Sequence, residues 1–278
     1  MVKIIADSAC LYSKSEGLEK GINITSLQVT INGKTYSEYE EINAKEFIEI
    51  IEQGHIPTSS QPPVGELLDL LEEFKHEDTL VVCMADGLSG TYASAVGARE
   101  TIEDNDKIRV INTQTLCGPE RYLVDLVSEM NKQDKTIDEM IYEINKRSKT
   151  ARSYLIPIDF DYLKRGGRLT PIAATIGGLL KLTPVLKQVN EGKKLDKLCV
   201  ARSFELAIKK IINDINESGI DSNHIITISH GFNEKQANIA KEKLEKAFPL
   251  NEIRVYELTC SFITQGGPGC VAIQTIER

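Results

Sequence analysis

The sequence lacks the segments that mark a protein for export or anchor it in a membrane. Its first apolar run, residues 2–6, is too short for a signal peptide and is followed by Asp7. The longest weakly polar run, residues 171–180, falls well short of the about 20 apolar residues that span a bilayer. We therefore expect a cytoplasmic protein with no stable membrane insertion.

Patterns for metal binding and disulfide bonding are absent as well. The cysteines form no CxxC pair, and neither HxxxH nor HExxH occurs. Most of the cysteines lie in or beside apolar segments, as small buried hydrophobic residues do. The pattern predicts a reducing cytoplasm and no metal ion.

Motifs for nucleotide binding and nucleophilic catalysis are also missing. No GxGxxG follows the first apolar run and no GxxxxGK[ST] occurs, so we expect no cofactor. The segment Gly87-Leu88-Ser89-Gly90 falls short of the GxSxG nucleophile elbow. The 33 Lys and Arg against 41 Asp and Glu give a formal net charge of −8, which repels phosphate backbones. Nucleic acid is therefore not an expected partner.

What is present is an alternation of strand-like and helix-like segments. Short apolar runs predict strands, and apolar residues three and four apart predict helices between them. The predicted strands are residues 2–6, 24–31, 79–84, 108–111, 151–156, 225–229, 253–258 and 271–276. The predicted helices are residues 44–53, 65–74, 92–102, 120–131, 137–148, 204–217 and 234–247. This alternation indicates an α/β protein.

The length of 278 residues and a change in pattern along the chain predict two domains. Residues 1–150 have long crossover helices, which predict a Rossmann-like domain with a parallel sheet. In residues 151–278, the runs 184–189 and 195–201 flank a turn that contains glycine and predict an antiparallel hairpin. We expect this second part to be an α+β domain with a mixed sheet, and the ligand to lie between the domains.

The sequence Asp-Gly-Leu-Ser-Gly-Thr-Tyr at residues 86–92 is the most informative one for function. It follows a buried-strand pattern and opens a predicted helix, where free backbone amides and the positive end of the helix dipole favour a carboxylate or phosphate. The alternative is that Ser89 only caps its own helix. Ligands of open α/β sheets lie beyond the carboxyl ends of the strands. The polar residues expected there are Asp7, Ser8, Ser89, Asn112 and Thr113.

Two polar loops are further candidates. Residues 57–63 place three consecutive hydroxyls and Gln61 before a predicted helix. Such clusters commonly cap helices, so a structural role is the alternative. Residues 264–269 form a glycine-rich loop, which either permits close approach of a ligand or is a plain turn.

The second half adds a cationic turn and a run of small residues. In residues 162–168, Arg165 and Arg168 either meet an anion or are surface charges. Residues 171–180 predict a short helix rich in Ala and Gly. Its small side chains form either a packing face or one wall of a slender apolar tunnel.

Six segments, in order, resemble the signature segments of the DegV family over the full chain. They are Ala-Asp-Ser at 6–8, Thr-Ser-Ser-Gln-Pro at 58–62, Leu-Ser-Gly-Thr-Tyr at 88–92, Tyr-Leu-Lys-Arg-Gly-Gly-Arg at 162–168, Leu-Leu-Lys-Leu-Thr-Pro at 179–184 and Gly-Pro-Gly at 267–269. The resemblance implies a two-domain α/β protein that buries one long-chain fatty acid between its domains. It also implies a non-catalytic, lipid-binding subunit that presents the acyl carboxylate to the ATP-using catalytic subunit of a bacterial fatty acid kinase, which makes an acyl phosphate.

The resemblance also implies site residues. It assigns the carboxylate to Thr58, Ser59 and Ser89, with Arg165 and Gln265 beside them, and gives a supporting polar role to Ser60, Gly90, Thr91, Arg168 and Gly267. The candidates for the acyl tunnel are Ile172, Ala173, Ile176, Gly177 and Leu180. A chain of about 16 carbons offers around 12 kcal/mol at about 0.8 kcal/mol per buried CH₂, so the tail holds the ligand and the hydroxyls orient it.

Three segments depart from the family pattern. Gln265 stands where a histidine is common, Ala85 and Asp86 stand where two serines are common, and Asn112-Thr113 replaces Asp-Ser. Gln265 donates only a neutral hydrogen bond, and Asp86 would repel a carboxylate that it faced. We expect weaker head-group binding, a different acyl preference or loss of kinase coupling.

Two other classes of function stay open. A serine-dependent acyl hydrolase would use Ser89 with His230, which follows a predicted strand, although the elbow motif and a clear acid partner are lacking. A regulatory module that binds no lipid is the other class.

Overall fold

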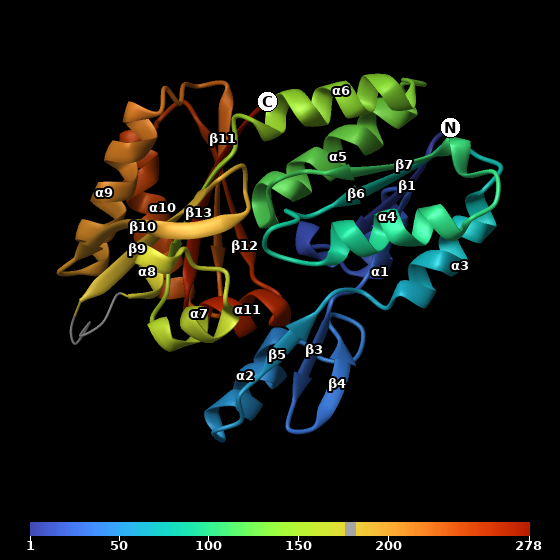
Figure 1. The fold of residues 1–278 in the computed structure, drawn as a ribbon. Helices are drawn as coiled ribbons and strands as arrows, with labels where there is room; N and C mark the ends of the chain where they lie inside the picture. The colour runs from blue at the N-terminus through green and yellow to red at the C-terminus, as the bar shows by residue number, and fades with distance from the viewer. Residues whose placement is uncertain (176–181) are drawn as a thin grey trace.

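The computed structural model describes residues 1–175 and 182–278. Two large β-sheets carry helices on their faces, and a smaller three-stranded sheet lies below them (Figure 1). The first large sheet is built from residues 3–112 and the second from residues 152–277. The boundary predicted near residue 150 falls between the last helix before the second sheet and its first strand. The predicted α/β class, with a parallel sheet followed by a mixed one, is confirmed.

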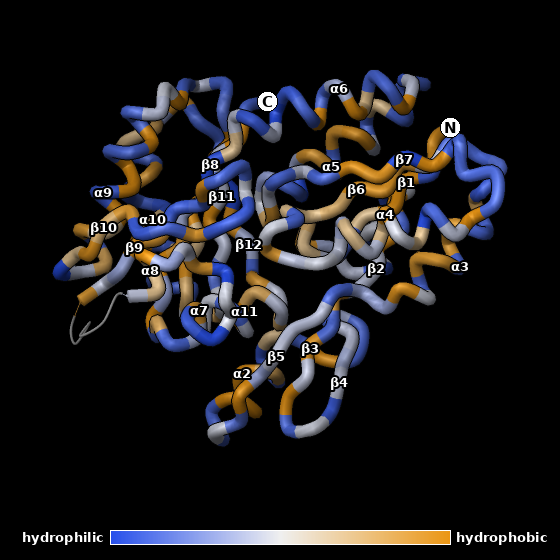
Figure 2. Tube along the Cα trace, viewed as in Figure 1, coloured by the Kyte–Doolittle hydropathy of each residue, from blue (hydrophilic) through white to orange (hydrophobic). Residues whose placement is uncertain are grey.

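The first large sheet, called here the parallel sheet, has the strand order β2-β1-β6-β7. Its strands are β2 (Ile22–Thr25), β1 (Lys3–Asp7), β6 (Thr79–Cys83) and β7 (Ile108–Asn112). All of its pairings are parallel. Such strands are buried on both faces and are apolar along most of their length, as the colouring of β1, β6 and β7 in Figure 2 shows.

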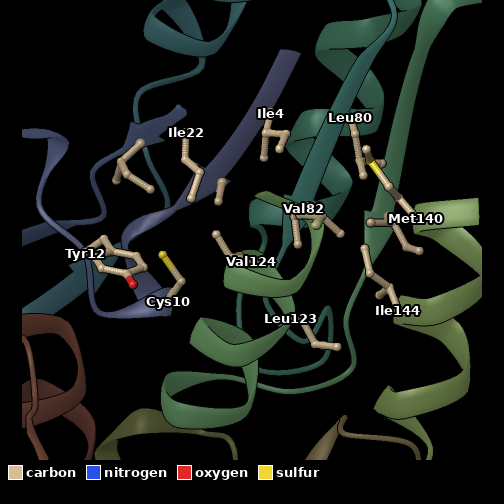
Figure 3. Packing of buried hydrophobic residues seen from close by; sticks show 14 of the residues in the cluster. Ile4, Cys10, Tyr12, Ile22, Leu80, Val82, Leu123, Val124, Met140 and Ile144 are labelled. Atoms are coloured by element: carbon tan, nitrogen blue, oxygen red, sulfur yellow. The ribbon is translucent and has the colours of Figure 1, made fainter. Parts of the chain in front are cut away.

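Helices cover both faces of the parallel sheet. They are α3 (Val64–Phe74) and α4 (Thr91–Thr101) on one face, and α5 (Cys117–Lys132) and α6 (Ile137–Ser148) on the other. Side chains alternate along a strand, so Ile4 packs with α5 and α6 whereas Ile5 packs with α3 and α4. Figure 3 shows the core on the side of α5 and α6, with Ile4, Leu80, Val82, Leu123, Val124, Met140 and Ile144.

The second large sheet, the mixed sheet, has the strand order β10-β9-β8-β13-β11-β12. Its strands are β8 (Arg152–Ile156), β9 (Thr183–Val189), β10 (Lys194–Ala201), β11 (His224–His230), β12 (Glu252–Glu257) and β13 (Val271–Glu277). Among the pairings of its described strands, only that of β11 with β12 is parallel, and the predicted hairpin is confirmed as β9 and β10. Helices α9 (Phe204–Glu217) and α10 (Glu234–Ala247) cover one face.

The small sheet has the order β4-β3-β5 and is antiparallel. It consists of β3 (Gln28–Ile31), β4 (Lys34–Ser37) and β5 (Thr58–Ser60), with α2 (Ala44–Glu52) packed beside it. The single strand predicted over residues 24–31 is therefore wrong, because the chain leaves β2 and enters β3 in another sheet. Leu27 fixes the change of sheet: its N–H donates to Ser8 Oγ at 2.9 Å, and its carbonyl accepts from the Glu38 N–H at 3.0 Å.

Several segments predicted as loops or turns are regular elements. Residues 57–63 contain β5, residues 162–168 contain most of α7 (Phe160–Gly166), and residues 264–269 contain the end of α11 (Cys260–Gly266). Gly167 ends α7 with a φ of +70°, which glycine adopts without strain. The helix predicted over residues 171–180 is described only as α8 (Pro171–Ala174), since residues 176–181 lie outside the described residues.

The remaining short elements are α1 (Lys14–Glu19) and the 3-10 helices η1 (Ser8–Cys10) and η2 (Asn105–Lys107). Within residues 1–175 and 182–278, no helix has both the length and the apolar character needed to cross a bilayer.

Candidate functional site

A polar pocket of about 460 Å³ lies where the small sheet and the two large sheets meet. Its walls are β5, the loop between β6 and α4, the residues that follow α7, and α11. The polar residues that line it are Ser59, Ser60, Gln61, Ser89, Arg168, Ser261 and Gln265. Segments far apart in the sequence thus form one site with hydroxyl, amide and guanidinium donors.

Ser89 stands at the entrance to α4. Its Oγ lies 2.8 Å from Thr91 Oγ1 and accepts a hydrogen bond from the Thr91 N–H at 3.3 Å. Gly90 is the N-cap and offers no side chain. Among the described residues, no acceptor pairs with the backbone amides of Tyr92 and Ala93. Ser89 therefore contacts its own helix, as the structural alternative predicts, yet the N-terminus of α4 keeps amide donors and the positive dipole end for an anion.

Gly90 also permits the approach of Gln61. A Cβ at residue 90 would collide with Gln61 Oε1, and Gln61 Nε2 donates to Ser94 Oγ on α4. The loop after β5 is thereby joined to α4 across the pocket. Helix α3 has Pro63 as its N-cap without a side-chain hydrogen bond, so the hydroxyls of β5 do not cap it.

Arg168 is the one cation among the described residues that line the pocket. Its Nε donates to the Leu88 carbonyl at 3.0 Å, and Nη1 donates to the Gly166 carbonyl. A guanidinium has five N–H donors, so donors remain for a carboxylate. Arg165 is exposed and stacks on the Tyr162 ring at 4.5 Å, outside the pocket.

Gln265 reaches the pocket from α11. Its Nε2 donates to Ser59 Oγ at 2.9 Å. Because Ser59 Oγ accepts this bond, its own hydroxyl proton stays available for an acceptor in the pocket. In the described part of the chain, Gln265 Oε1 is buried without a donor.

Asp7 and Ser8, which we expect near the ligand, instead form hydrogen bonds with backbone N–H groups and with a buried carboxylate, respectively. Asp7 accepts from the N–H groups of Ala9 at 3.0 Å and Met84 at 2.9 Å. Its burial raises its pKa to about 7, although those two hydrogen bonds act in the opposite direction. Ser8 Oγ donates to the buried Glu38 at 2.6 Å. Neither residue lines the pocket.

The other departures from the family pattern also lie outside the pocket. Asn112 Oδ1 accepts from the N–H two residues later at 2.9 Å, and Thr113 Oγ1 donates to the Cys83 carbonyl at 3.0 Å. Asp86 Oδ2 lies 3.8 Å from Lys193 Nζ. The carboxylate of Asp86 therefore pairs with a cation and does not line the pocket. The expected repulsion between Asp86 and a carboxylate bound in the pocket has no structural support.

An apolar cavity continues from the polar pocket. The two spaces share Met84, Leu88, Arg168, Phe262 and Gln265. The cavity, about 100 Å³ by the same measure, extends between the loop after β7 and the face of β8 and β13 that α9 and α10 leave uncovered. Its other apolar residues include Leu116, Leu155, Leu163, Leu195, Leu258 and Ala272. The site thus has a polar end and an apolar end.

The described tunnel candidates lie elsewhere. Ile172 is 68% exposed, and Ala173 is buried in a cluster with Phe160, Leu163 and Leu186, of which only Leu163 lines the cavity. Neither lines the apolar cavity. Ile176, Gly177 and Leu180 lie outside the described residues.

The structure gathers only part of the predicted polar set. It brings together Ser59, Ser60, Ser89, Gly90, Arg168 and Gln265. It leaves outside the pocket Thr58, Thr91, Arg165 and Gly267. Thr58 is exposed on β5, and Gly267 has a φ of +80° and lies against the Tyr162 ring.

The predicted site residues do not include six residues that line the polar pocket, which are Leu27, Gln61, Met84, Leu88, Ser261 and Phe262. Gln61 belongs to the segment at 58–62 that carries the family resemblance, so that segment was the available signal. Ser261 and Phe262 lie in α11, and the sequence gives no signal that this helix turns them toward the pocket.

His230 lies at the end of β11, and its Nδ1 accepts from the Asn233 N–H at 3.1 Å. Burial lowers its pKa. Ser89 lines the polar pocket and His230 does not. The Ser–His pair that the hydrolase alternative needs is not assembled in this structure.

Comparisons with known proteins agree with the resemblance. The model of the DegV family, described as a family of uncharacterised proteins, matches residues 1–278. Protein DegV of Bacillus subtilis is 31% identical over 215 residues, which cover 74% of this chain and 76% of that protein. The crystal structure of DegV, a fatty acid binding protein from Bacillus subtilis, has a TM-score of 0.85 at 28% identity and covers 100% of this chain and 99% of its own.

A DegV lipid binding protein from Thermotoga maritima has a TM-score of 0.85 at 26% identity, with 100% of this chain and 99% of that chain covered. Sequence and fold therefore agree along the full length. The chain belongs to the DegV family.

Proposed function

We propose that this protein binds one long-chain fatty acid, with the carboxylate in the polar pocket and the acyl chain in the apolar cavity. The observation that carries the proposal is the continuity of the two spaces through Met84, Leu88, Phe262, Arg168 and Gln265. A ligand with an anionic head and an apolar tail matches such a site. The Bacillus subtilis relative, a fatty acid binding protein of the same fold, supports this ligand class.

The head-group contacts follow from the donors in the pocket. Ser59 and Ser89 donate their hydroxyl protons to the carboxylate, and Arg168 neutralises its charge. Gln265 holds Ser59 in place through the bond to its Oγ. Among the described residues, Arg168 replaces Arg165 as the cation of the proposed site, because only Arg168 lines it.

The tail supplies most of the affinity. Each buried CH₂ contributes about 0.8 kcal/mol, whereas a hydrogen bond to a charged group contributes about 1.5 to 3 kcal/mol. The proposed role of the polar pocket is therefore to place the carboxylate where a second protein reaches it. The predicted contribution of Ile176, Gly177 and Leu180 to the tail site stays a prediction.

We also propose that the bound carboxylate is presented to the ATP-using subunit of a fatty acid kinase, for acyl phosphate formation in the cytoplasm. The exposed Ser60 at the rim supports this, since it places the polar end of the site next to solvent. The absence of nucleotide-binding motifs in this sequence supports a separate subunit for ATP. In this proposal the protein itself is not catalytic.

The test uses protein stripped of lipid under mild conditions. Palmitate or oleate is titrated by calorimetry, and the loaded protein is then mixed with a fatty acid kinase catalytic subunit and ATP. We expect one fatty acid per chain and ATP-dependent acyl phosphate. Absence of any fatty acid binding would contradict the main proposal, and binding without acyl phosphate would contradict only the kinase partnership. Turnover of acyl esters that Ser89→Ala abolishes would support the hydrolase instead.

A further inference from the structure

The apolar cavity runs along the two central strands of the mixed sheet. On β13 its wall contains Ala272 and Gln274, and on β8 it contains Leu155 and Ser153. Ala272 pairs with Leu155, and Gln274 pairs with Ser153. Side chains two residues apart lie on the same face of a strand, about 7 Å apart. Gln265 lines the polar pocket and Cys270 immediately precedes β13, so the start of β13 is the part of the strand nearest that pocket. Ser153 and Gln274 lie further along the paired strands, at the inner end of the cavity.

This inner end is closed by hydrogen bonds that Gln274 makes. Its Nε2 donates to the Leu116 carbonyl at 3.0 Å and to Ser153 Oγ at 2.9 Å. Its Oε1 accepts from the Gly118 N–H at 3.2 Å. Gln274 is 1% exposed and Ser153 is 6% exposed. Gln274 thus ties the start of α5 to both strands, with both amide hydrogens and its oxygen in use.

A second polar pocket of about 450 Å³ lies behind this closure. It is lined by Arg152, Lys187 and Gln188 among others, and it shares Ser153 with the apolar cavity. Ser153 therefore stands between an apolar space and a polar one, whose charged lining residues are Lys149, Arg152, Lys187 and Glu191.

We propose that Ser153 and Gln274 form the floor of the acyl site and set the longest fatty acid that this protein binds. The inference rests on the proposed function, since it assigns the end of the same ligand. An acyl chain that fits the cavity ends against the side chains of Ser153 and Gln274, which are hydrogen-bonded to each other. A longer acyl chain must break the hydrogen bonds of Gln274, which leaves buried groups of Leu116 and Gly118 unpaired, or must enter the second polar pocket.

The test measures dissociation constants for a series of even-chain saturated fatty acids. We compare the wild-type protein, Ser153→Leu and Ser153→Gly after removal of lipid. Ser153→Leu is expected to move the affinity maximum to chains shorter by about two carbons, because the larger side chain fills the inner end. Each methylene excluded from the cavity costs about fourfold in affinity. Ser153→Gly is expected to move the maximum toward longer chains, because it opens the way to the second pocket.

Two controls separate a floor from a general packing effect. Ser153→Ala changes the volume little and is expected to keep the wild-type length preference. Ala272→Val adds bulk in the middle of the cavity and is expected to weaken binding of all lengths alike. Circular dichroism checks the fold of each variant, and Ser153→Gly alone suffices if Ser153→Leu does not fold.

An unchanged length preference in folded Ser153→Gly, and in Ser153→Leu where it folds, would overturn the inference while fatty acid binding stands. A wild-type protein that binds no member of the series would contradict the proposed function, and the floor with it.

Discussion

Gln265 Nε2 donates to Ser59 Oγ at 2.9 Å, and this bond joins α11 to the small sheet at the polar pocket. The bond leaves the Ser59 proton free for an acceptor. Gln265 occupies the position where the family resemblance leads us to expect a histidine. The amide orients Ser59 but brings no positive charge, so Arg168 remains the cation of the described pocket.

Gln265→His is expected to tighten palmitate binding, about tenfold near pH 6 and less near pH 8. Imidazolium donates a charged hydrogen bond, which is about twice as strong as a neutral one, and an unperturbed histidine loses its charge around pH 6.5. Calorimetry at the two pH values checks this. Binding no tighter than that of the wild-type protein near pH 6 would contradict the role of position 265.

Ser89→Ala is expected to weaken fatty acid binding by about tenfold to a hundredfold, because a hydrogen bond to a charged group contributes about 1.5 to 3 kcal/mol. The matched control is Thr58→Ala, which also removes one hydroxyl but at an exposed position outside the pocket. Displacement of a fluorescent fatty acid measures both. Equal affinities of the two variants would show that Ser89 does not contact the carboxylate.

Arg168→Gln is expected to weaken binding by more than tenfold, because it removes a charged donor, and to lower the melting temperature through loss of the bond to the Leu88 carbonyl. Arg165→Gln, at an exposed cation that stacks on Tyr162, is expected to change both quantities little. The same displacement and melting experiments compare them. A larger effect of Arg165→Gln would restore the assignment that the resemblance gives.

The sequence predicts the layers of this fold well and the small sheet poorly. Periodicity locates Ile4, Ile5 and the helices around them, because a strand covered on both faces is apolar throughout. Residues 24–31 carry apolar side chains at only four positions, and this run is predicted as one strand. The prediction misses the change of sheet at Leu27, because that change depends on hydrogen bonds to Ser8 and Glu38, which lie far from the local pattern.

The site, like the fold, is predicted where local sequence segments identify residues and is missed where distant contacts decide. The segments that resemble the family identify Ser59, Ser89 and Gln265, which meet in the pocket. These segments do not show which of Arg165 and Arg168 lines the pocket, because that depends on where α7 ends, at Gly167. The cavity wall at Leu155 and Ala272 comes from pairing between distant strands, which no local pattern contains.

A buried carboxyl predicts the pH dependence of stability. Glu120 on α5 is fully buried, and neither of its oxygens has a hydrogen-bond partner among the described residues. Burial, and then the nearby Asp7, raises the pKa of Glu120 well above its ordinary value of 4.5. The folded state thus holds a proton that the unfolded state releases, so this contribution to stability is lost as the pH rises above about 4.5. Asp7 acts with the same sign up to its pKa of about 7.

Glu120→Gln is therefore expected to raise the free energy of unfolding near pH 8, by about 2 kcal/mol, and to change it less near pH 5. The amide carries no charge, so the fall in stability with rising pH becomes smaller. Urea denaturation at the two pH values checks this. A variant whose stability has the same pH dependence as that of the wild-type protein would show that the pKa of Glu120 does not differ between the folded and unfolded states.

Native mass spectrometry of the freshly purified protein, followed by denaturation and identification of the released molecule, tests the central proposal most directly. The account predicts one long-chain fatty acid per chain, or uptake of one from an added mixture if the preparation is empty. A protein that carries no fatty acid and takes up none would contradict it.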